Sequence, residues 1–324
     1  MGVRVGLIGT GYAAKVRAES FLGHVQSDVV RVAGRDLSRA KAFAMEYGLT
    51  VSESWQDLVS AADVDLVVIS TVSALHGDMT EAALDADKHV VVEYPLSLDV
   101  VQAERLVMMA EAKGLMLHVE HIELLGGLHL AMRSHLPSIG TPLYINYRTL
   151  NPQHPAPKKW TYHQKLSGFP FCNALSRVNR LTRVFGEVRA VDCCMRMRLD
   201  EQEENYFKSI LSSGRLQFAN GAVAERTYGK GEDLWAYRRE VEIQGSMGAI
   251  SFNRNEGILT TAEGKKKIAV APRKGLFLQD TQTVLAHLPE GEPLYVTASE
   301  SLYALKVGDA MRRASESGQT VHLD

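Results

Sequence analysis

The sequence predicts an α/β fold, in which an N-terminal Rossmann domain with a doubly wound parallel sheet precedes an α+β domain with an open, mainly antiparallel sheet. Two observations support this prediction. Up to about residue 120, short apolar runs alternate with helical stretches, which is typical of a parallel sheet with helices on both faces. After residue 120, strand-like segments follow one another and are separated by turn signals. We therefore expect a Rossmann domain over residues 1–120 and the α+β domain over residues 121–324.

The first domain contains strands and helices in alternation. Apolar runs such as Leu66-Val67-Val68-Ile69 indicate strands that are buried on both faces, and Gly114 is typical of the end of a helix. The predicted strands are 3–8, 29–33, 65–70, 89–93 and 115–118. The predicted helices are 13–21, 37–47, 78–86 and 100–113.

The second domain begins with a predicted helix over 121–135 and ends with a predicted helix over 301–315. Between them, residues 144–149 alternate like an antiparallel strand, and turn signals such as Asn220-Gly221 separate further strands. These further strands are 188–197, 215–218, 222–227, 239–244 and 249–252. The proline-rich stretch 151–157 is expected to be a loop, and an aromatic and basic cluster follows it.

The composition excludes several classes of protein. The 324 residues include 36 Lys and Arg against 38 Asp and Glu, so the net charge of −2 lacks the basic excess expected of a protein that coats nucleic acid. No apolar run approaches the ~20 residues that span a bilayer, and the first residues show no signal-peptide pattern. The 3 cysteines form neither a disulfide framework nor a Cys-x-x-Cys metal pair. We expect a cytoplasmic protein of two domains without a nucleic-acid or membrane partner.

A glycine-rich turn follows the first predicted strand. Gly9-Thr10-Gly11-Tyr12-Ala13-Ala14 is a G-x-G-x-x-A pattern between a strand and a helix, the context in which this motif indicates a dinucleotide site. Gly9 permits the tight turn, Gly11 lets the backbone approach a pyrophosphate, and Ala14 allows close packing of helix on strand. The phosphates would lie at the helix N-terminus, where unpaired N–H groups and the helix dipole favour anions.

The end of the second predicted strand favours NADPH. An NAD site usually has Asp or Glu at this position to bond the ribose 2′-hydroxyl, but the chain has Gly34 there, followed by Arg35. Arg35 can pair with a 2′-phosphate, with support from Ser38 or Arg39, and NADH would bind more weakly. In the alternative interpretation, Arg35 and Asp36 only solvate a turn.

These motifs resemble the glucose–fructose oxidoreductase and inositol dehydrogenase family over essentially the whole chain. The resemblance implies a Rossmann domain followed by an α+β domain whose sheet forms the substrate face. The family usually has Glu-Lys-Pro after the fifth strand, where this chain has Glu93-Tyr94-Pro95. An ungapped count from Phe185-Gly186 places Cys172 and Ser176 where the family usually has an Asp and a His. The acid–base residues of a sugar dehydrogenase are therefore largely missing.

The segments in which this chain differs from the usual family pattern resemble the biliverdin reductases, one branch of that family. The segments that carry this resemblance are Glu93-Tyr94-Pro95-Leu96, residues 118–127, Ala174-Leu175-Ser176-Arg177, residues 151–163, residues 228–232 and residues 273–277. The resemblance implies that NADPH reduces the central methine bridge (C10) of biliverdin, a tetrapyrrole, to give bilirubin. Such a reaction needs a hydride on carbon and a proton on a pyrrole nitrogen, so the missing lysine is tolerable.

The resemblance also implies roles for individual residues. Arg177 corresponds to a catalytic arginine, and because a guanidinium keeps its proton in proteins, it would polarise the pyrrole system or order a donating water. Tyr94 and Glu120 are the other two expected catalytic residues, Tyr94 by stacking or hydrogen bonding and Glu120 by ordering a proton-relay water. The expected substrate-binding residues are Tyr94, Glu120, Glu123, Trp160 and Arg177. Tyr162 and Phe169 would offer further stacking surface, and Lys158 and Lys159 would offer further countercharge. The expected cofactor-binding residues are Gly9, Thr10, Gly11, Tyr12, Ala13, Arg35, Ser38, Arg39, Ser70, Thr71, His76 and Glu93.

Alternatives stay open at this point. His118, Glu120 and His121 are residue types that could bind a metal, but the resemblance implies no metal site. The chain could be an NAD(P)-dependent sugar or cyclitol dehydrogenase, against which Tyr94 counts. It could also be a non-catalytic dinucleotide sensor or bilin-binding regulator, because fold alone does not determine activity. No sequence feature decides the oligomeric state.

Overall fold

A computed structural model describes residues 2–323, apart from the side chains of Cys172 and Asn173. The described residues form two compact units. The first runs up to Ile122 and includes Gly275–Leu302, and the second contains Glu123–Lys274 and the chain from Tyr303 onward. The boundary at Ile122 lies close to the predicted one at residue 120. The return of Gly275–Leu302 to the first unit differs from the prediction, which placed everything after residue 120 in the second domain.

The first unit is built on a parallel sheet, as predicted. Its strand order across the described residues is β3-β2-β1-β4-β5-β6, and every pair is parallel. The elements are β1 (Val3–Ile8), α1 (Tyr12–Leu22), β2 (Ser27–Ala33), α2 (Leu37–Tyr47), β3 (Thr50–Val51), α3 (Trp55–Ser60), β4 (Leu66–Ile69), η1 (Ser73–Leu75), α4 (His76–Asp85), β5 (His89–Glu93), α5 (Val100–Lys113), β6 (Leu117–Glu120) and α10 (Leu276–Glu290).

The strand β6 begins later than the predicted 115–118. Gly114 has the left-handed conformation (φ 62°), and the amide of Leu115 donates back to the carbonyl of Ala110 at 2.9 Å. This closing turn of α5 uses the residues at which the strand was expected to start. The strand therefore runs on to Glu120, which places a carboxylate at its carboxyl end.

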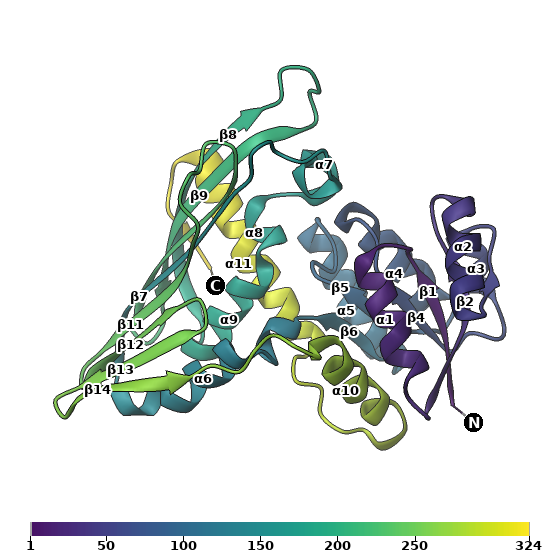
Figure 1. Cartoon of the computed structure of the whole chain (residues 1–324), viewed down its shortest axis with the longest axis horizontal. Helices are drawn as coiled ribbons and strands as arrows, with labels where there is room; N and C mark the ends of the chain where they lie inside the picture. Colours follow the sequence, from purple (N-terminus) through teal and green to yellow (C-terminus); the bar gives the residue numbers. More distant parts are fainter. Residues whose placement is uncertain (1, 324) are drawn as a thin grey trace. The chain divides into compact units, whose positions relative to one another are not determined.

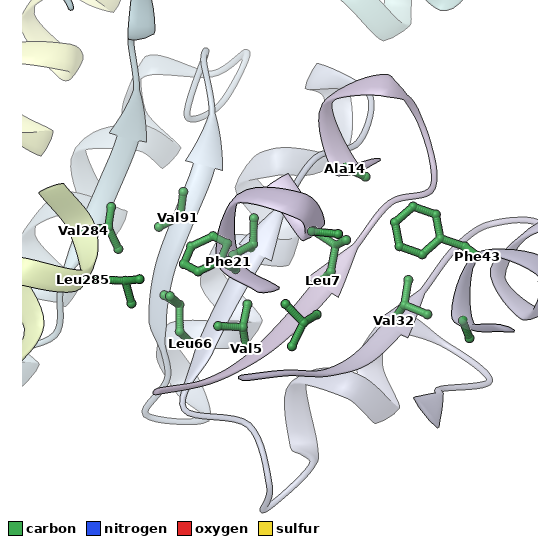
Figure 2. Close-up of a cluster of buried hydrophobic side chains, with 14 of the residues drawn as sticks. Val5, Leu7, Ala14, Phe21, Val32, Phe43, Leu66, Val91, Val284 and Leu285 are labelled. Atoms are coloured by element: carbon green, nitrogen blue, oxygen red, sulfur yellow. The ribbon is translucent and has the colours of Figure 1, made fainter. Parts of the chain in front are cut away.

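The core of the first unit explains why Gly275–Leu302 belongs to it. Figure 2 shows Val284 and Leu285 of α10 beside Val91, Leu66 and Phe21, which belong to the Rossmann sheet and to α1. All five side chains are buried. Helix α10 thus contributes apolar side chains to the core of a sheet whose strands lie more than a hundred residues earlier in the chain.

The second unit is built on a mixed sheet with the order β14-β13-β12-β11-β7-β10-β9-β8-β15 across the described residues. Its elements are α6 (Gly127–His135), η3 (Leu136–Ile139), β7 (Pro142–Pro152), η4 (Trp160–Tyr162), α7 (Gln164–Ser167), α8 (Pro170–Asn173), α9 (Leu175–Phe185), β8 (Val188–Leu199), β9 (Phe207–Phe218), β10 (Val223–Gly231), β11 (Arg238–Gly245), β12 (Gly248–Asn253), β13 (Glu256–Thr261), β14 (Gly264–Ala269) and β15 (Val321–His322). The turn η2 (Ile122–Leu124) and helix α11 (Ala298–Ser317) contain residues of both units.

The sheet is mostly antiparallel, as predicted, but β7 is an exception. Residues 144–149 were expected to pair antiparallel, and β7 does so with β11, whereas its pairing with β10 is parallel. Alternating burial is the same in both kinds of pairing, so the pattern could not determine the direction of a strand. The expected helix over 121–135 begins only at Gly127, because Ile122–Leu124 forms a 3-10 turn.

Helices cover one face of this sheet. Figure 1 shows α9 and α11 on the same side of the strands, with β7 to β14 forming an extended layer. A Cβ atom on Gly214 of β9 would collide with Met311, which shows how closely α11 packs on the sheet. The register of β7 and β10 places Tyr147 opposite Arg226 and Thr149 opposite Tyr228. No described helix in either unit has the length and hydropathy to cross a membrane.

Candidate active site

The glycine-rich turn has the geometry that a dinucleotide site needs. Gly9 has φ 128°, and a Cβ atom on it would collide with the carbonyl oxygen of Ser70 at the end of β4, so only glycine fits. A Cβ on Gly11 would have nothing within 4 Å, which leaves open space in front of α1. No side chain caps α1 and its first turn has no acidic residue. Its first amides can therefore bind an anion.

The residues around this turn differ in exposure. Tyr12 is 80% exposed, Thr10 and Ala13 are half-buried, and Ala14 is buried in the core. Ser70 lies beneath the turn with its hydroxyl buried and without a hydrogen-bond partner among the described residues. The turn is thus packed against Ser70 on one side and has open space at Gly11 on the other.

The end of β2 carries exposed cations. A Cβ on Gly34 would approach Thr10 to 2.9 Å, so an acidic side chain there would require Thr10 to move. Asp36 caps α2 by accepting from the amides of Ser38 and Arg39 at 3.0 and 3.1 Å, so it has a structural role beyond solvating a turn. Arg35 and Arg39 are exposed. These residues fit a dinucleotide that carries a 2′-phosphate.

His76 is buried between two segments of the first unit. Its Nδ1 lies 2.8 Å from the carbonyl oxygen of Pro95 and its Nε2 3.4 Å from that of Thr71. Burial lowers the pKa of His76, although both carbonyls oppose this shift, so the ring is neutral at pH 7. His76 therefore connects the segment after β4 with the segment after β5, and it can position Thr71 near a bound cofactor.

Two carboxyl groups lie side by side at the carboxyl ends of β5 and β6. The register pairs Glu93 with Glu120, and Arg17 donates its Nε hydrogen to Glu93 at 3.1 Å. Burial and then the neighbouring Glu93 raise the pKa of Glu120 well above its usual range, although Arg17 opposes them. Burial and the neighbouring carboxyl therefore both favour the protonated form of Glu120, and its predicted role in ordering a proton-relay water stays a prediction.

A buried polar network lies behind this pair. Arg17 also donates to Asp280 of α10, and Asp280 accepts from Tyr295 at 2.6 Å and contacts Nε2 of His118 at 2.7 Å. Burial opposes the charge on Asp280, but Arg17 and His118 hold the pKa of its carboxyl far below the usual range. The network therefore keeps one anion fully paired and fixes Arg17 next to Glu93.

Tyr94 has one face of its ring occupied. It stacks on His121 with ring centroids 5.1 Å apart and an interplanar angle of 5°. His121 Nε2 lies 2.8 Å from Oγ of Ser301, and burial, followed by repulsion from His118, lowers the pKa of His121 to about 3. Among the described residues, no group of three or more His, Cys, Asp and Glu side chains is arranged to hold a metal ion.

Arg177 lies on α9 in the second unit. Its Nε donates to Oγ1 of Thr149 at 3.2 Å, and its Cζ lies 5.5 Å from the centroid of the Tyr228 ring. Thr149 and Tyr228 are opposite each other on β7 and β10. The predicted catalytic arginine therefore lies over the polar part of the sheet face that α9 covers.

Glu123 is surrounded by arginines. Its carboxylate contacts Arg180 at 3.3 Å, Arg239 at 3.5 Å and also Arg273. Burial alone would raise the pKa of Glu123, but these arginines lower it below the usual range. The structure gives Glu123 a clear role in holding three cations in place, and leaves its predicted contact with substrate as a proposal.

The loop after β7 carries Trp160, an aromatic side chain that is partly exposed. Trp160 is 37% exposed, whereas Tyr162, also expected to offer stacking surface, is buried 5.1 Å from the Phe207 ring centroid. Lys158, expected to offer countercharge, is paired with Glu203. Of the stacking side chains that we expected, Trp160 and the half-buried Phe169 remain candidates.

Several residues of these networks escaped sequence reasoning. Arg17 shares a helix face with the buried Ala14, Ala18 and Phe21, and a charge on an apolar face was the available signal. Arg226, Tyr228 and Lys230 alternate along β10 on one face, so the pattern of the strand could have grouped them. Asp280 carried no local signal, because its partners lie far away in the sequence.

Comparisons with known proteins identify relatives along the whole chain. The GFO/IDH/MocA profile, described as an oxidoreductase family with an NAD-binding Rossmann fold, matches residues 3–121. The profile of the C-terminal alpha/beta domain of this family matches residues 137–323. Together these matches confirm the expected fold class and the expected family resemblance.

Individual relatives include both kinds of enzyme considered above. The crystal structure of biliverdin reductase from Synechocystis sp. PCC 6803, in complex with biliverdin and NADP+, has 45% identity and a TM-score of 0.94, covering 97% of this chain and 99% of that chain. Biliverdin reductase A of Mus musculus is 25% identical over 95% of this chain and 94% of its own length. The scyllo-inositol 2-dehydrogenase (NADP(+)) of Bacillus subtilis is 24% identical over 99% of this chain and 96% of its own length.

Proposed function

This chain belongs to the GFO/IDH/MocA oxidoreductase family, and on that premise we propose that it is a biliverdin reductase. The observation that carries the proposal is the likeness to the Synechocystis enzyme, at 45% identity over 97% of the chain. Tyr94 supports it, because it replaces the lysine that the sequence comparison expected in a sugar dehydrogenase.

We propose NADPH as the cofactor. Its pyrophosphate would lie over Gly11 at the start of α1, and its 2′-phosphate would be held by Arg35 with Arg39. Ser70 and Thr71, supported by His76, would line the same edge of the sheet. When bound, NADPH supplies the hydride for the methine carbon. NADH would bind more weakly because it offers no phosphate to Arg35.

Side chains of the protein would then move the proton and stabilise the negative charge that develops on the pyrroles. Arg177 would polarise the conjugated pyrroles as the methine carbon gains the hydride, because a fixed cation next to developing negative charge lowers the barrier. Glu120, whose pKa burial and Glu93 raise, would order a water that relays protons. Tyr94 would contact the substrate with the edge or face that His121 does not cover.

The substrate is flat, largely apolar and carries two carboxylates. Trp160 would stack on it, and the cations of the second unit would attract its carboxylates. We also infer a cytoplasmic location, where the exposed thiol of Cys194 would stay reduced.

A sugar or cyclitol dehydrogenase is the second candidate, because the Bacillus relative matches nearly the whole chain. Such a reaction needs a base to remove a hydroxyl proton, whereas Tyr94 stands at the expected lysine and the raised pKa of Glu120 favours its protonated form. A non-catalytic bilin or dinucleotide sensor is the third candidate, and it would bind both ligands without turnover.

One experiment separates the three candidates. Protein, NADPH and biliverdin are mixed without oxygen, and the absorbance of the verdin and of the yellow product is followed between about pH 5 and 8, the range in which histidines titrate. Loss of the verdin band with gain of the yellow band is expected. Absence of turnover with tight binding of both ligands would indicate a sensor, and NADP-linked oxidation of a polyol panel would indicate a dehydrogenase.

A further inference from the structure

Arg226 is a buried cation in the second unit. Its side chain is 1% exposed, and its guanidinium lies 3.9 Å from the Phe171 ring centroid and donates through Nη2 to the carbonyl of Ala174 at 3.3 Å. Among the residues that the structure describes, Nε and Nη1 of Arg226 have no hydrogen-bond partner and no carboxylate pairs with it. A buried charge without a counterion is strongly unfavourable, so its retention calls for a function.

Tyr228 lies against this cation and against Arg177. The Cζ atoms of Arg177 and Arg226 are 5.5 and 5.9 Å from the centroid of the Tyr228 ring. Tyr228 is two residues from Arg226 on β10 and so occupies the same face of the sheet, opposite the Thr149 to which Arg177 donates. One half-buried phenol thus has two guanidinium groups around it.

Two other ionisable groups in this part of the second unit, Cys193 and Tyr162, have raised pKa values. Burial and Cys194 raise the pKa of Cys193 to about 12, and burial followed by Tyr228 raises that of Tyr162 to about 12. Tyr147 is buried and accepts a hydrogen bond from Arg180. Burial raises the pKa of Tyr228 as well, but Arg177 and Arg226 both oppose that rise, and the phenol remains protonated at neutral pH.

We propose that Tyr228 donates the proton to the pyrrole nitrogen of the bound tetrapyrrole, and that Arg226 acts through Tyr228 by stabilising the phenolate. This inference rests on the proposed function. The methine carbon gains the hydride that NADPH supplies, an electron pair moves through the conjugated system to a pyrrole nitrogen, and that nitrogen takes the phenolic hydrogen as the O–H bond breaks. Water then returns a proton to the phenolate. The uncompensated charge of Arg226 thereby finds its counterion only as the proton leaves.

The test begins with Tyr228→Phe, which removes the proton and keeps the ring. Single turnover of biliverdin with NADPH should slow by about 100-fold and lose its solvent isotope effect, while the affinity for both ligands stays the same. Tyr144→Phe is the matched control, because Tyr144 is on β7 with its side chain on the opposite face and donates to Glu225 at 2.8 Å. A Tyr228→Phe enzyme with wild-type turnover and isotope effect would overturn the proposal.

The second test measures the coupling without any turnover. Arg226→Met should raise the pKa of one phenol, seen as phenolate absorbance in a pH titration, and Tyr228→Phe should abolish this difference. Arg226→Lys should restore part of the wild-type titration and turnover. Arg226→Met should also slow turnover in the wild type but have little further effect in Tyr228→Phe.

The outcomes separate this inference from the proposed function. A wild-type protein that does not reduce biliverdin defeats the proposed function. An unchanged phenol titration in Arg226→Met, or equal slowing of the wild type and Tyr228→Phe by that substitution, defeats the role of Arg226. If Arg226→Met does not fold, Arg226→Gln, which removes the charge but keeps a polar side chain, supplies the same titration and turnover comparison.

Discussion

In the first unit the buried carboxylate of Asp280 contacts Arg17, His118 and Tyr295, whereas in the second unit the buried guanidinium of Arg226 contacts a carbonyl and an aromatic ring. Both residues lie on the inside of their unit. The first charge is paired within the protein, and the second is not paired by any carboxylate in the described part of the chain. The comparison teaches that two equally buried charges can differ in their pairing, and our proposal assigns a function to the one without a carboxylate partner.

The largest effect is expected on stability, from removing the buried Asp280 that pairs with Arg17. Asp280→Ala leaves Arg17 buried with one partner fewer, and the free energy of unfolding should fall by about 3–5 kcal/mol. Denaturant titration measures it. The double variant Arg17→Met with Asp280→Leu should lose less, because neither Arg17 nor Asp280 is then left as a buried charge without its partner. Equal losses in the single and double variants would contradict the account of a paired structural charge.

Arg177 tests the second unit through catalysis. Arg177→Ala should lower kcat by about 10²–10³-fold, the usual effect of removing one group that stabilises charge in a transition state. The Kd for NADPH should not change, because the proposed cofactor residues lie in the first unit. Arg177→Lys should recover part of the rate by restoring a cation without the planar fork. Unchanged kcat in Arg177→Ala would remove its catalytic role.

Glu120 tests whether a carboxyl in the first unit is held neutral. Burial and Glu93 raise its folded pKa above the usual 4.5, so the folded protein keeps a proton that the unfolded chain releases. The resulting stabilisation is complete below pH 4.5 and is lost as the pH rises through the folded pKa. Glu120→Gln should therefore gain stability relative to the wild type as the pH rises, by up to about 1.4 kcal/mol per pH unit. Parallel stability curves for the two proteins would show that Glu120 is ionised in the fold.

Lys230 should show the opposite dependence in the second unit. Burial lowers its pKa from 10.5 to about 8, so the unfolded chain binds more protons between these values. Stability from this group is present above pH 10.5 and is lost as the pH falls through about 8. Lys230→Met should remove that dependence while keeping the contacts with Tyr162 and Phe207. Unfolding titrations on both sides of pH 8 measure the difference, and identical pH profiles would contradict it.

Arg35 extends the comparison to an exposed cation, for which the smallest effect is expected. Arg35→Ala should weaken NADPH by about 10-fold, the loss of roughly one charge-assisted hydrogen bond, and leave NADH unchanged. Fluorescence titration of both cofactors gives the ratio. Equal weakening of the two would mean that Arg35 does not contact the 2′-phosphate.

The sequence was most informative where local chemistry determines structure. The turn at Gly9 and Gly11, and the replacement of an acid by Gly34 and Arg35, were visible because each depends on a few adjacent residues. The direction of β7 was not visible, because side-chain alternation is the same in parallel and antiparallel strands. The strands β13 and β14 were missed as well, because residues such as Lys265, Lys266 and Lys267 leave little apolar pattern.

The site residues also divide into those that a short segment identifies and those that only the folded chain brings together. Arg177, Tyr94 and Glu120 came from a resemblance in short segments, and their networks could not be read from those segments. Asp280 is 263 residues from Arg17, and Tyr228 is associated with Arg177 only through the register of β10 with β7. Contacts of this kind form between residues far apart in the chain, so a short stretch of sequence cannot predict them.

The return of α10 to the first unit has a consequence for the order of folding. A ribosome finishes the six parallel strands well before it makes Val284, Leu285 and Asp280, and the strands β7 to β14 of the second sheet are synthesised in between. Until then Phe21 lacks part of its apolar surroundings and Arg17 lacks its anion. The core of the N-terminal domain, which would ordinarily be complete first during synthesis, is therefore completed by residues made after most of its neighbour.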